Sequence, residues 1–164
     1  MHRYLLGLAA GLVIGASISW GIASAHVRVF PDEANTRTMA CTFAKYTVRV
    51  PTEKSIPTVK VRVVMPRGIT AFNIQPKPSW RYSIEKSKGR IAAVTWYGGK
   101  IGVGEFDEFA FVAGNPRTPM TVAWDAYQTY ADGSVVKWTG APGSDTPHSQ
   151  TQVMADPAAC KAEH

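Results

Sequence analysis

The sequence lacks several features that define common protein classes. Only one long apolar run is present, at the extreme N-terminus, so no other segment reaches the length needed to span a bilayer. Two cysteines are too few for a disulfide-dense scaffold or for a zinc site made of cysteine alone. With 14 glycines and 11 prolines in 164 residues, the composition is neither collagen-like nor that of a low-complexity linker.

Charge is also sparse, and it is evenly distributed. Charged residues make up 18% of the chain and hydrophobic residues 45%, a balance that excludes a disordered chain. The formal net charge is +6, but the lysines and arginines are scattered rather than gathered in one basic stretch. This distribution argues against a nucleic-acid partner and is more typical of a weak attraction to anionic components of the cell envelope.

The N-terminal segment, residues 1–25, has the pattern of a secretory signal peptide. Arg3 precedes an apolar run that ends in the small residues Ala23-Ser24-Ala25. Cleavage after Ala25 would make His26 the first residue of a mature chain in the periplasm or outside the cell. An uncleaved N-terminal anchor is the alternative, and the small residues before His26 favour cleavage. We expect the mature chain to have no membrane span.

The rest of the chain alternates apolar and polar residues with a period of two. Residues 46–50, with the sequence Tyr-Thr-Val-Arg-Val, are one example. Such alternation predicts antiparallel strands with one buried and one exposed face, and Asp132-Gly133 predicts a tight hairpin. We therefore expect an all-β, immunoglobulin- or fibronectin-like antiparallel β-sandwich of about eight or nine strands over residues 26–140. A polar, proline-rich tail over residues 141–164 is expected to follow it.

Cys41 and Cys160 both fall in the exported part of the chain. An oxidising compartment favours a disulfide between them, which would tie the tail to the first third of the domain. Two separate thiols, or soft ligands for Cu(I), are the alternatives. The distance between the two cysteines in the sequence does not decide among these interpretations.

A histidine at the first position of a mature chain has a particular chemistry. The α-amine and the ring Nδ1 of His26 can close a chelate ring on one metal ion, so that a single residue supplies two nitrogen ligands. Two nitrogens completed by oxygen ligands suit the tetragonal geometry of Cu(II). The alternative is that a histidine follows the cleavage site by chance, since exported chains begin with many different residues.

From the predicted cleavage site onward, the sequence resembles the YcnI-like copper-binding domain family. The matching segments cover nearly the whole chain after the signal peptide, and the last is the most specific: AHVRVFPDEA at 25–34, KYTVRVPTEKSIPTVKVRVVMP at 45–66, PKPSWRYSIEK at 76–86, GEFDEFAFVAGNP at 104–116 and WDAYQTYADGSVVKWTGAPGSDTPHS at 124–149. The resemblance implies an exported β-sandwich that binds Cu(II) through its N-terminal histidine, in an arrangement called a monohistidine brace. A carboxylate and a tryptophan complete this site. The resemblance also implies a role in copper acquisition, trafficking or homeostasis, with other copper-handling proteins of the envelope as partners.

Carried over residue by residue, the resemblance assigns the brace to His26 and the tryptophan to Trp138. Two carboxylates of the segment GEFDEF fit the third role. Glu105 shares the strand parity of the inward residues of this segment, so we expect its side chain to point inward, where a cation would offset the cost of burying its charge. Glu108 has the outward parity and is the alternative ligand. His148 also matches the family, and we expect it to pack on the domain, with metal ligation as its less favoured role.

No catalytic motif accompanies this site. The sequence has no nucleophile set with supporting motifs and no glycine-rich phosphate loop, so we expect a binding protein rather than an enzyme. One alternative is a copper oxygenase of the lytic polysaccharide type, which needs a second histidine that only His148 could supply. Another is an adhesion or carbohydrate-binding sandwich that uses Trp80, Trp96 or Trp124. The apolar neighbours of these tryptophans in the sequence place them in the core instead.

Overall fold

A computed structural model describes residues 26–31 and 36–161 of the chain. The predicted signal peptide, residues 1–25, lies outside the described residues. Within the described ranges, no helix has the length and the apolar character needed to cross a membrane. The described residues cover most of the predicted exported chain.

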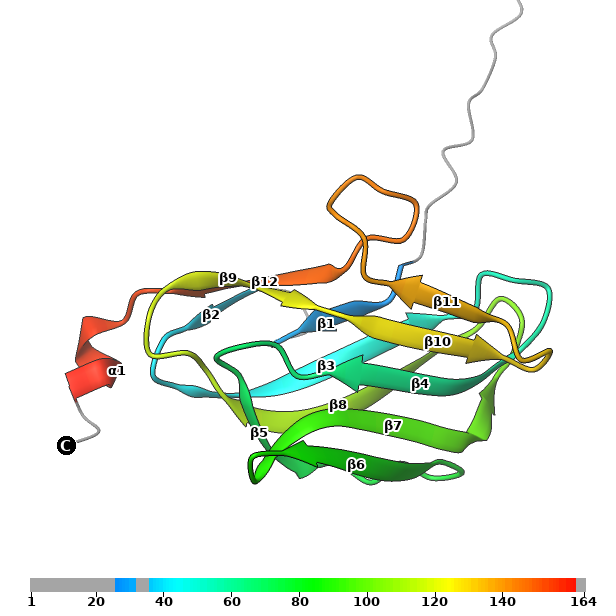
Figure 1. Ribbon diagram of the computed structural model, residues 1–164, viewed down its shortest axis with the longest axis horizontal. Helices are drawn as coiled ribbons and strands as arrows, with labels where there is room; N and C mark the ends of the chain where they lie inside the picture. Colours follow the sequence, from blue (N-terminus) through cyan, green and yellow to red (C-terminus); the bar gives the residue numbers. More distant parts are fainter. Residues whose placement is uncertain (1–25, 32–35, 162–164) are drawn as a thin grey trace, which may run out of the picture.

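The chain forms two main sheets and a smaller third one (Figure 1). The four-stranded sheet contains, in spatial order, β1 (Arg28–Phe30), β3 (Phe43–Pro51), β8 (Phe106–Gly114) and β5 (Thr70–Ile74). The five-stranded sheet contains β11 (Val135–Trp138), β10 (Ala126–Tyr130), β4 (Thr58–Val64), β7 (Arg90–Ile101) and β6 (Arg81–Ser87). The small sheet contains β2 (Arg37–Met39), β12 (Ser149–Met154) and β9 (Met120–Trp124), and the short helix α1 (Pro157–Lys161) follows it.

Strand β3 shows how the alternating sequence produces a sandwich. Tyr46, Val48 and Val50 are fully buried, whereas Lys45 on the opposite face is exposed. The strand pairs antiparallel with β8 along its whole length, and the inward residues of both strands face the second sheet. The predicted all-β, immunoglobulin-like antiparallel sandwich is therefore confirmed. The predicted hairpin at Asp132-Gly133 joins β10 to β11 and is confirmed as well.

The core between the sheets is built largely from aromatic rings. Trp96 stacks on Phe109 with ring centroids 5.0 Å apart, and the centroid of Trp124 lies 4.9 Å from that of Tyr46. Rings of this size bury a large apolar area and dominate core packing. Trp80, like these two tryptophans, is buried. The three tryptophans weighed as a carbohydrate platform thus lie in the core, as their apolar sequence neighbours predicted.

Two features differ from the sequence-based expectation. The described residues contain twelve strands rather than eight or nine, because β1 and β2 are only three residues long and carry little periodic signal. The segment expected to form an extended tail after Gly140 contains β12, which pairs with β9 and β2 inside the small sheet. Thr151 and Val153 of β12 are buried, so this strand belongs to the packed part of the structure.

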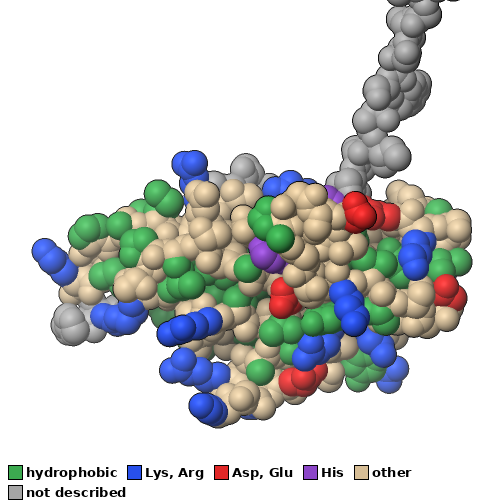
Figure 2. All heavy atoms as spheres, turned by 45° about the horizontal axis from the view of Figure 1, so that its top comes forward, with side chains coloured by type: hydrophobic (Ala, Val, Ile, Leu, Met, Phe, Trp, Pro, Cys, Tyr) green, Lys and Arg blue, Asp and Glu red, His purple; other side chains and the backbone are tan. Residues whose placement is uncertain are grey.

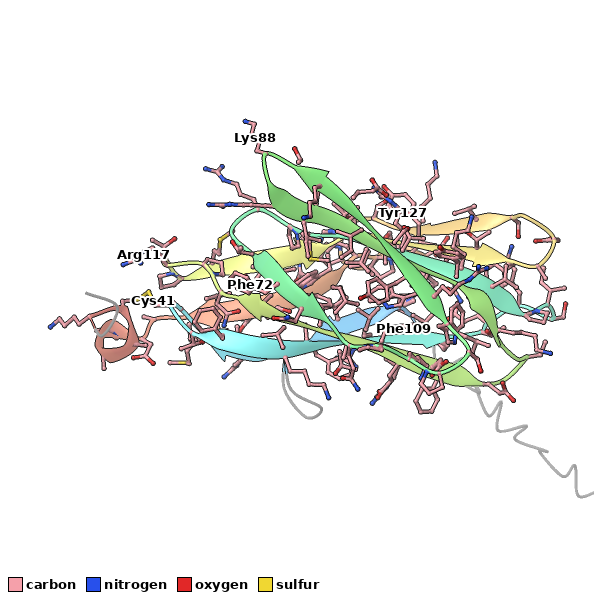
Figure 3. All side chains as sticks on the ribbon, turned by 90° about the horizontal axis from the view of Figure 1, so that it is seen from below. Cys41, Phe72, Lys88, Phe109, Arg117 and Tyr127 are labelled. Atoms are coloured by element: carbon pink, nitrogen blue, oxygen red, sulfur yellow. A yellow bond between two sulfur atoms is a disulfide. The ribbon has the colours of Figure 1, made fainter. Side chains whose placement is uncertain are left out.

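A disulfide bond closes the end of the sandwich that carries α1. Cys41 and Cys160 are bonded, with their Cα atoms 5.0 Å apart, which confirms the predicted pairing. The carboxylate of Asp156 accepts hydrogen bonds from the backbone N–H groups of Ala158 and Ala159 and so caps the first turn of α1. Figure 3 shows Cys41 beside Arg117 at this end of the molecule. The bridge anchors α1 to the segment between β2 and β3.

Candidate metal centre

His26 lies at the edge of the sandwich, where the two main sheets come together. Strand β1, which begins two residues later, is the edge strand of the four-stranded sheet, and β11 is the edge strand of the five-stranded sheet (Figure 1). Val27 and Val29 point inward and are buried, so they fix the direction of the chain just after His26. The imidazole of His26 is half-buried as a result.

The ring of His26 rests against the indole of Trp138, the last residue of β11. The ring centroids are 5.2 Å apart and the ring planes are inclined by 56°. Trp138 is only 2% exposed, so the indole forms a wall behind the imidazole rather than part of the open surface. The structure therefore brings together two of the residues that the sequence assigned to the site, although they lie more than a hundred positions apart.

A buried glutamine holds this tryptophan in place. The indole Nε1–H of Trp138 donates a hydrogen bond of 3.0 Å to Oε1 of Gln128. The amide nitrogen of Gln128 donates in turn to the backbone oxygen of Pro51 and to the hydroxyl of Thr58, both at 2.7 Å. Since the indole N–H already has a partner, Trp138 can offer a bound metal ion only the face or edge of its ring.

Sequence reasoning did not single out Gln128. The signal was present, because Gln128 has the same strand parity as Ala126 and Tyr130, which are both apolar and buried. A polar residue at such a position must find hydrogen-bond partners inside the protein. In this structure the partners are the indole of Trp138 and the groups around it.

His26 opens onto a groove of about 750 Å³. The groove is lined by the start of the described chain at residues 26–28, by Arg49 and Pro51 of β3, by Phe106 of β8, by the loop that precedes β12, and by the first two residues of β12. Arg28 and Arg49 lie directly opposite each other on β1 and β3, and both line the groove. Among the described residues, no aspartate or glutamate lines it. The groove is therefore cationic, and its two imidazoles come from His26 and His148.

The inward orientation expected for Glu105 is wrong. Strand β8 begins only at Phe106, and Glu105 belongs to the turn before it, where strand parity does not apply. Its exposed carboxylate accepts a hydrogen bond of 2.8 Å from the backbone N–H of Gly102, within the same turn. The residue nevertheless adjoins the groove, since the next residue, Phe106, lines it.

Glu108 has the outward orientation that its parity predicted. Its Oε1 lies 2.7 Å from both Nε and Nη2 of Arg49, so the carboxylate is part of a charge-assisted ion pair. This pair offsets the repulsion between Arg28 and Arg49 on neighbouring strands. Glu108 does not line the groove.

His148 lines the same groove as His26, on the loop before β12. Figure 2 shows histidine side chains, in purple, on this face of the molecule. Within residues 26–31 and 36–161, no three histidine, cysteine, aspartate or glutamate side chains gather closely enough to hold a metal ion. A metal centre here would therefore depend on donors other than a ready-made cluster of described side chains, such as a main-chain amine.

Comparison with known proteins identifies a matching family and a sequence relative. Residues 26–160 match a family described as a domain of unknown function, DUF1775. The copper-binding protein CutI of Bacillus subtilis (strain 168) is 44% identical over 135 residues, which make up 81% of this chain. The matched part spans 64% of the length of CutI.

Solved structures support the fold. A protein from Nocardia farcinica described as having an immunoglobulin-like fold matches with a TM-score of 0.67 and 27% identity, over 78% of this chain and 97% of that chain. A cohesin from the archaeon Archaeoglobus fulgidus matches with a TM-score of 0.50 and 10% identity, over 85% of this chain and 97% of its own, and shows likeness of fold alone. The match to DUF1775 and the identity with CutI confirm the resemblance drawn from the sequence: the chain belongs to the DUF1775 family, which includes the YcnI-like copper-binding domains.

Proposed function

We propose that this protein is an exported copper-binding protein that holds Cu(II) through His26. In this proposal, removal of residues 1–25 exposes the α-amine of His26 in the periplasm or outside the cell. The protein then acts in copper acquisition, trafficking or homeostasis together with other copper-handling proteins of the envelope. It acts by binding copper as cargo rather than by catalysing a reaction. The similarity to CutI, a protein named for copper binding, supports the choice of metal.

The observation that carries the proposal is the position of His26. The residue lies at the predicted cleavage site, at the mouth of a groove, and its imidazole rests on the buried indole of Trp138. A chain that began at His26 would place an amine and an imidazole nitrogen next to each other at this point. Because Val27 and Val29 anchor the following residues in the core, the two nitrogens would be held rather than left on a mobile end.

A carboxylate is the third ligand of the proposed site, and Glu105 remains the favoured residue. Each candidate must give up an existing contact before it can bind copper. Glu108 would leave the guanidinium group of Arg49 beside another arginine, whereas Glu105 would leave only one exposed backbone N–H, which water can solvate. Release of Glu105 therefore costs less than release of Glu108.

The proposal is tested by the length of the N-terminus. The cleaved chain starting at His26, verified by intact mass, is compared with a chain that retains Ala25, and the Cu(II) affinity of each is measured by competition titration. Retaining Ala25 turns the amine into an amide and removes one of two chelating nitrogens. Since losing an outer-shell partner already costs roughly 10–100-fold in metal affinity, losing a ligand should cost at least as much.

A second variant, His26→Ala in the cleaved form, keeps the amine and removes the imidazole. Both altered chains should bind Cu(II) much more weakly than the cleaved protein, while their thermal unfolding stays the same within a few degrees. Equal affinity of the cleaved chain and the chain with Ala25 would contradict the proposal.

A further inference from the structure

A second pocket, of about 530 Å³, lies outside the proposed copper site and shares no lining residue with the groove beside His26. Three of the residues that line it are arginines, namely Arg67, Arg90 and Arg117. Among the described residues, no aspartate or glutamate lines this space. We call it the arginine pocket. A pocket lined by charges of one sign concentrates ions of the opposite sign, so its natural ligand is an anion.

The fold gathers three arginines that lie far apart in the sequence. Arg67 belongs to the connection between β4 and β5, Arg90 is the first residue of β7, and Arg117 belongs to the connection between β8 and β9. Figure 3 shows Arg117 and Lys88, which lies two positions before Arg90, in the same half of the view. The even spread of lysine and arginine along the chain therefore hides a local concentration of positive charge in the folded protein.

Buried contacts anchor the wall of the pocket that carries Arg117. The side-chain oxygen of Asn115 accepts a hydrogen bond of 2.7 Å from the hydroxyl of Tyr46. The backbone oxygen of Pro116 accepts a hydrogen bond of 3.0 Å from the N–H of Cys41, whose side chain is held in the disulfide. The two residues before Arg117 are therefore attached to the body of the sandwich, and this wall is formed before any ligand binds.

Close packing holds Arg67 against the same wall. Gly68 has a φ of +91°, in the left-handed region that favours glycine. A Cβ atom at this position would lie only 2.9 Å from Cγ of Pro116. Because glycine leaves room for this approach, the connection that carries Arg67 lies directly against the connection that carries Arg117.

The donors of the pocket are suited to an anion with several oxygens. A guanidinium group presents five N–H donors in a planar fork, and this geometry matches phosphate and carboxylate. Within the described part of the chain, neither Arg67 nor Arg90 forms an ion pair with a carboxylate. Thr70 and Thr118 also line the pocket, and their hydroxyls can donate to further oxygens.

A phosphate group fits this set of donors better than a carboxylate. One arginine fork can satisfy both oxygens of a carboxylate, whereas the oxygens of a phosphate group point in several directions and can accept from more than one arginine. We propose that the arginine pocket binds a phosphate group, either as free phosphate or as the phosphate of an anionic lipid headgroup. This inference is independent of copper binding, because no residue of the pocket lines the groove beside His26.

The first arm of the test titrates the cleaved protein with inorganic phosphate at constant ionic strength. Nuclear magnetic resonance follows the backbone amide signals of Gly68 and Thr118, which both line the pocket. The double variant Arg67→Gln, Arg90→Gln should bind phosphate at least about tenfold more weakly than the unaltered protein, since it loses two charged donors. The double variant Arg67→Lys, Arg90→Lys keeps the charge but loses the planar forks, so its affinity should fall between these two.

The matched control is the double variant Arg81→Gln, Lys100→Gln. It removes the same charge from two exposed positions outside the pocket, so it should bind phosphate like the unaltered protein. Arg67 and Arg90 are exposed as well, and all variants should unfold thermally within a few degrees of the unaltered protein. Acetate at the same ionic strength should bind far more weakly than phosphate, and equal saturation by acetate would contradict the choice of a phosphate group.

The second arm distinguishes the two sources of phosphate by sedimentation with vesicles of phosphatidylglycerol and phosphatidylcholine. If the ligand is a lipid headgroup, Arg67→Gln, Arg90→Gln should be retained far less than the control double variant, which has the same net charge. If the ligand is free phosphate, the vesicles should retain both double variants equally, while the phosphate titration still separates them. Equal behaviour of the two double variants in both arms overturns the inference and leaves the proposed copper site unaffected.

Discussion

The imidazole of His26 lies 5.2 Å from the indole of Trp138, measured between ring centroids, and the indole is held from behind by Gln128. This relationship joins the first residue of the predicted mature chain to the end of β11. It also means that a copper ion bound by the imidazole of His26 would lie near one particular tryptophan. Cu(II) quenches indole fluorescence at short range, so the contact between the two rings has a direct optical consequence.

We predict that Trp138→Phe removes most of the copper-dependent fluorescence quenching. The substitution also deletes the indole N–H and leaves the buried Oε1 of Gln128 without its partner. An unsatisfied buried acceptor costs about 1–3 kcal/mol, and the smaller ring adds a cavity term. Steady-state fluorescence during Cu(II) titration measures the first effect, and urea unfolding measures the second.

Trp124→Phe is the matched control for this prediction. Trp124 is also fully buried, and its Nε1–H also donates to a buried side chain, the hydroxyl of Thr151. Its loss should therefore cost a similar free energy of unfolding. Because Trp124 packs on Tyr46 and Phe111 rather than on His26, its replacement should leave the extent of quenching largely unchanged. Equal quenching in Trp138→Phe and in the unaltered protein would place the copper elsewhere.

The sandwich itself could be predicted from the sequence, since strands such as β10 and the second half of β4 alternate between buried and partly exposed residues. Strand β12 could not be predicted. Its segment, SQTQVM, is polar, yet Thr151 is fully buried because its hydroxyl accepts a hydrogen bond from Trp124. A polar residue whose partner lies 27 positions away in the sequence carries no local sign of burial.

The sequence predicted the candidate site only at His26 and Trp138, the first from its position after a cleavage motif and the second from the family resemblance. The position of His26 after a cleavage motif, and the resemblance that pointed to Trp138, named two residues that the structure places in contact. The predicted inward orientation of Glu105 was wrong because residue 105 belongs to the turn between β7 and β8. The alternation of a strand therefore does not apply to it. Ser149 lines the groove and is hydrogen-bonded to Val29, which lies 120 positions earlier in the chain, and no periodic pattern reveals such a contact.

Removing the disulfide should destabilise the protein without affecting copper binding. Cys41 and Cys160 are 119 residues apart, and a loop of that size corresponds to about 4–5 kcal/mol in the chain-entropy description. The bond lies at the end of the sandwich that carries α1, away from β11 (Figure 1), and neither cysteine lines the groove beside His26. Urea unfolding of the double variant Cys41→Ala, Cys160→Ala measures the loss, and Cu(II) titration of the same variant should match the unaltered protein. A loss of copper affinity in the folded double variant would contradict this separation.

Stability should fall at high pH because of Tyr46. Burial raises the pKa of the Tyr46 hydroxyl, which donates a hydrogen bond to Asn115 at 2.7 Å. The unfolded chain releases this proton near pH 10, the ordinary value for tyrosine, whereas the folded protein retains it. The contribution of Tyr46 to the free energy of unfolding is therefore complete below about pH 10. As the pH rises further, this contribution falls by up to about 1.4 kcal/mol per pH unit.

The measurement for Tyr46 is urea unfolding between pH 8 and pH 11. Tyr46→Phe should be less stable than the unaltered protein at pH 8 by about 1–3 kcal/mol, since the oxygen of Asn115 loses its donor. Between pH 10 and pH 11, the same variant should lose stability less steeply. Parallel pH profiles for the two proteins would show that another group causes the alkaline loss.

The two candidate carboxylates can be separated by paired amide substitutions. Glu105→Gln keeps the side-chain volume and deletes the charge, so it should weaken Cu(II) binding if Glu105 is the oxygen ligand. Its effect on the free energy of unfolding should be small, because the carboxylate is exposed and has one hydrogen bond within its turn. Glu108→Gln should do the reverse: copper affinity is kept, and the ion pair with Arg49 is lost. That pair is about one third exposed, so its loss should cost no more than about 1 kcal/mol.

Salt provides an independent check on this assignment. The cost of Glu108→Gln should shrink as sodium chloride is raised from low concentration to about 1 M, because added ions weaken the attraction between partly exposed charges. A metal–carboxylate bond is far less sensitive to screening, so the affinity difference between Glu105→Gln and the unaltered protein should persist in high salt. If Glu108→Gln weakens copper binding and Glu105→Gln does not, Glu108 must turn away from Arg49 when the metal arrives. In that case Glu108 would no longer neutralise Arg49, which lies opposite Arg28. Repulsion between the two arginines would then oppose copper binding, so the Cu(II) affinity would depend strongly on salt.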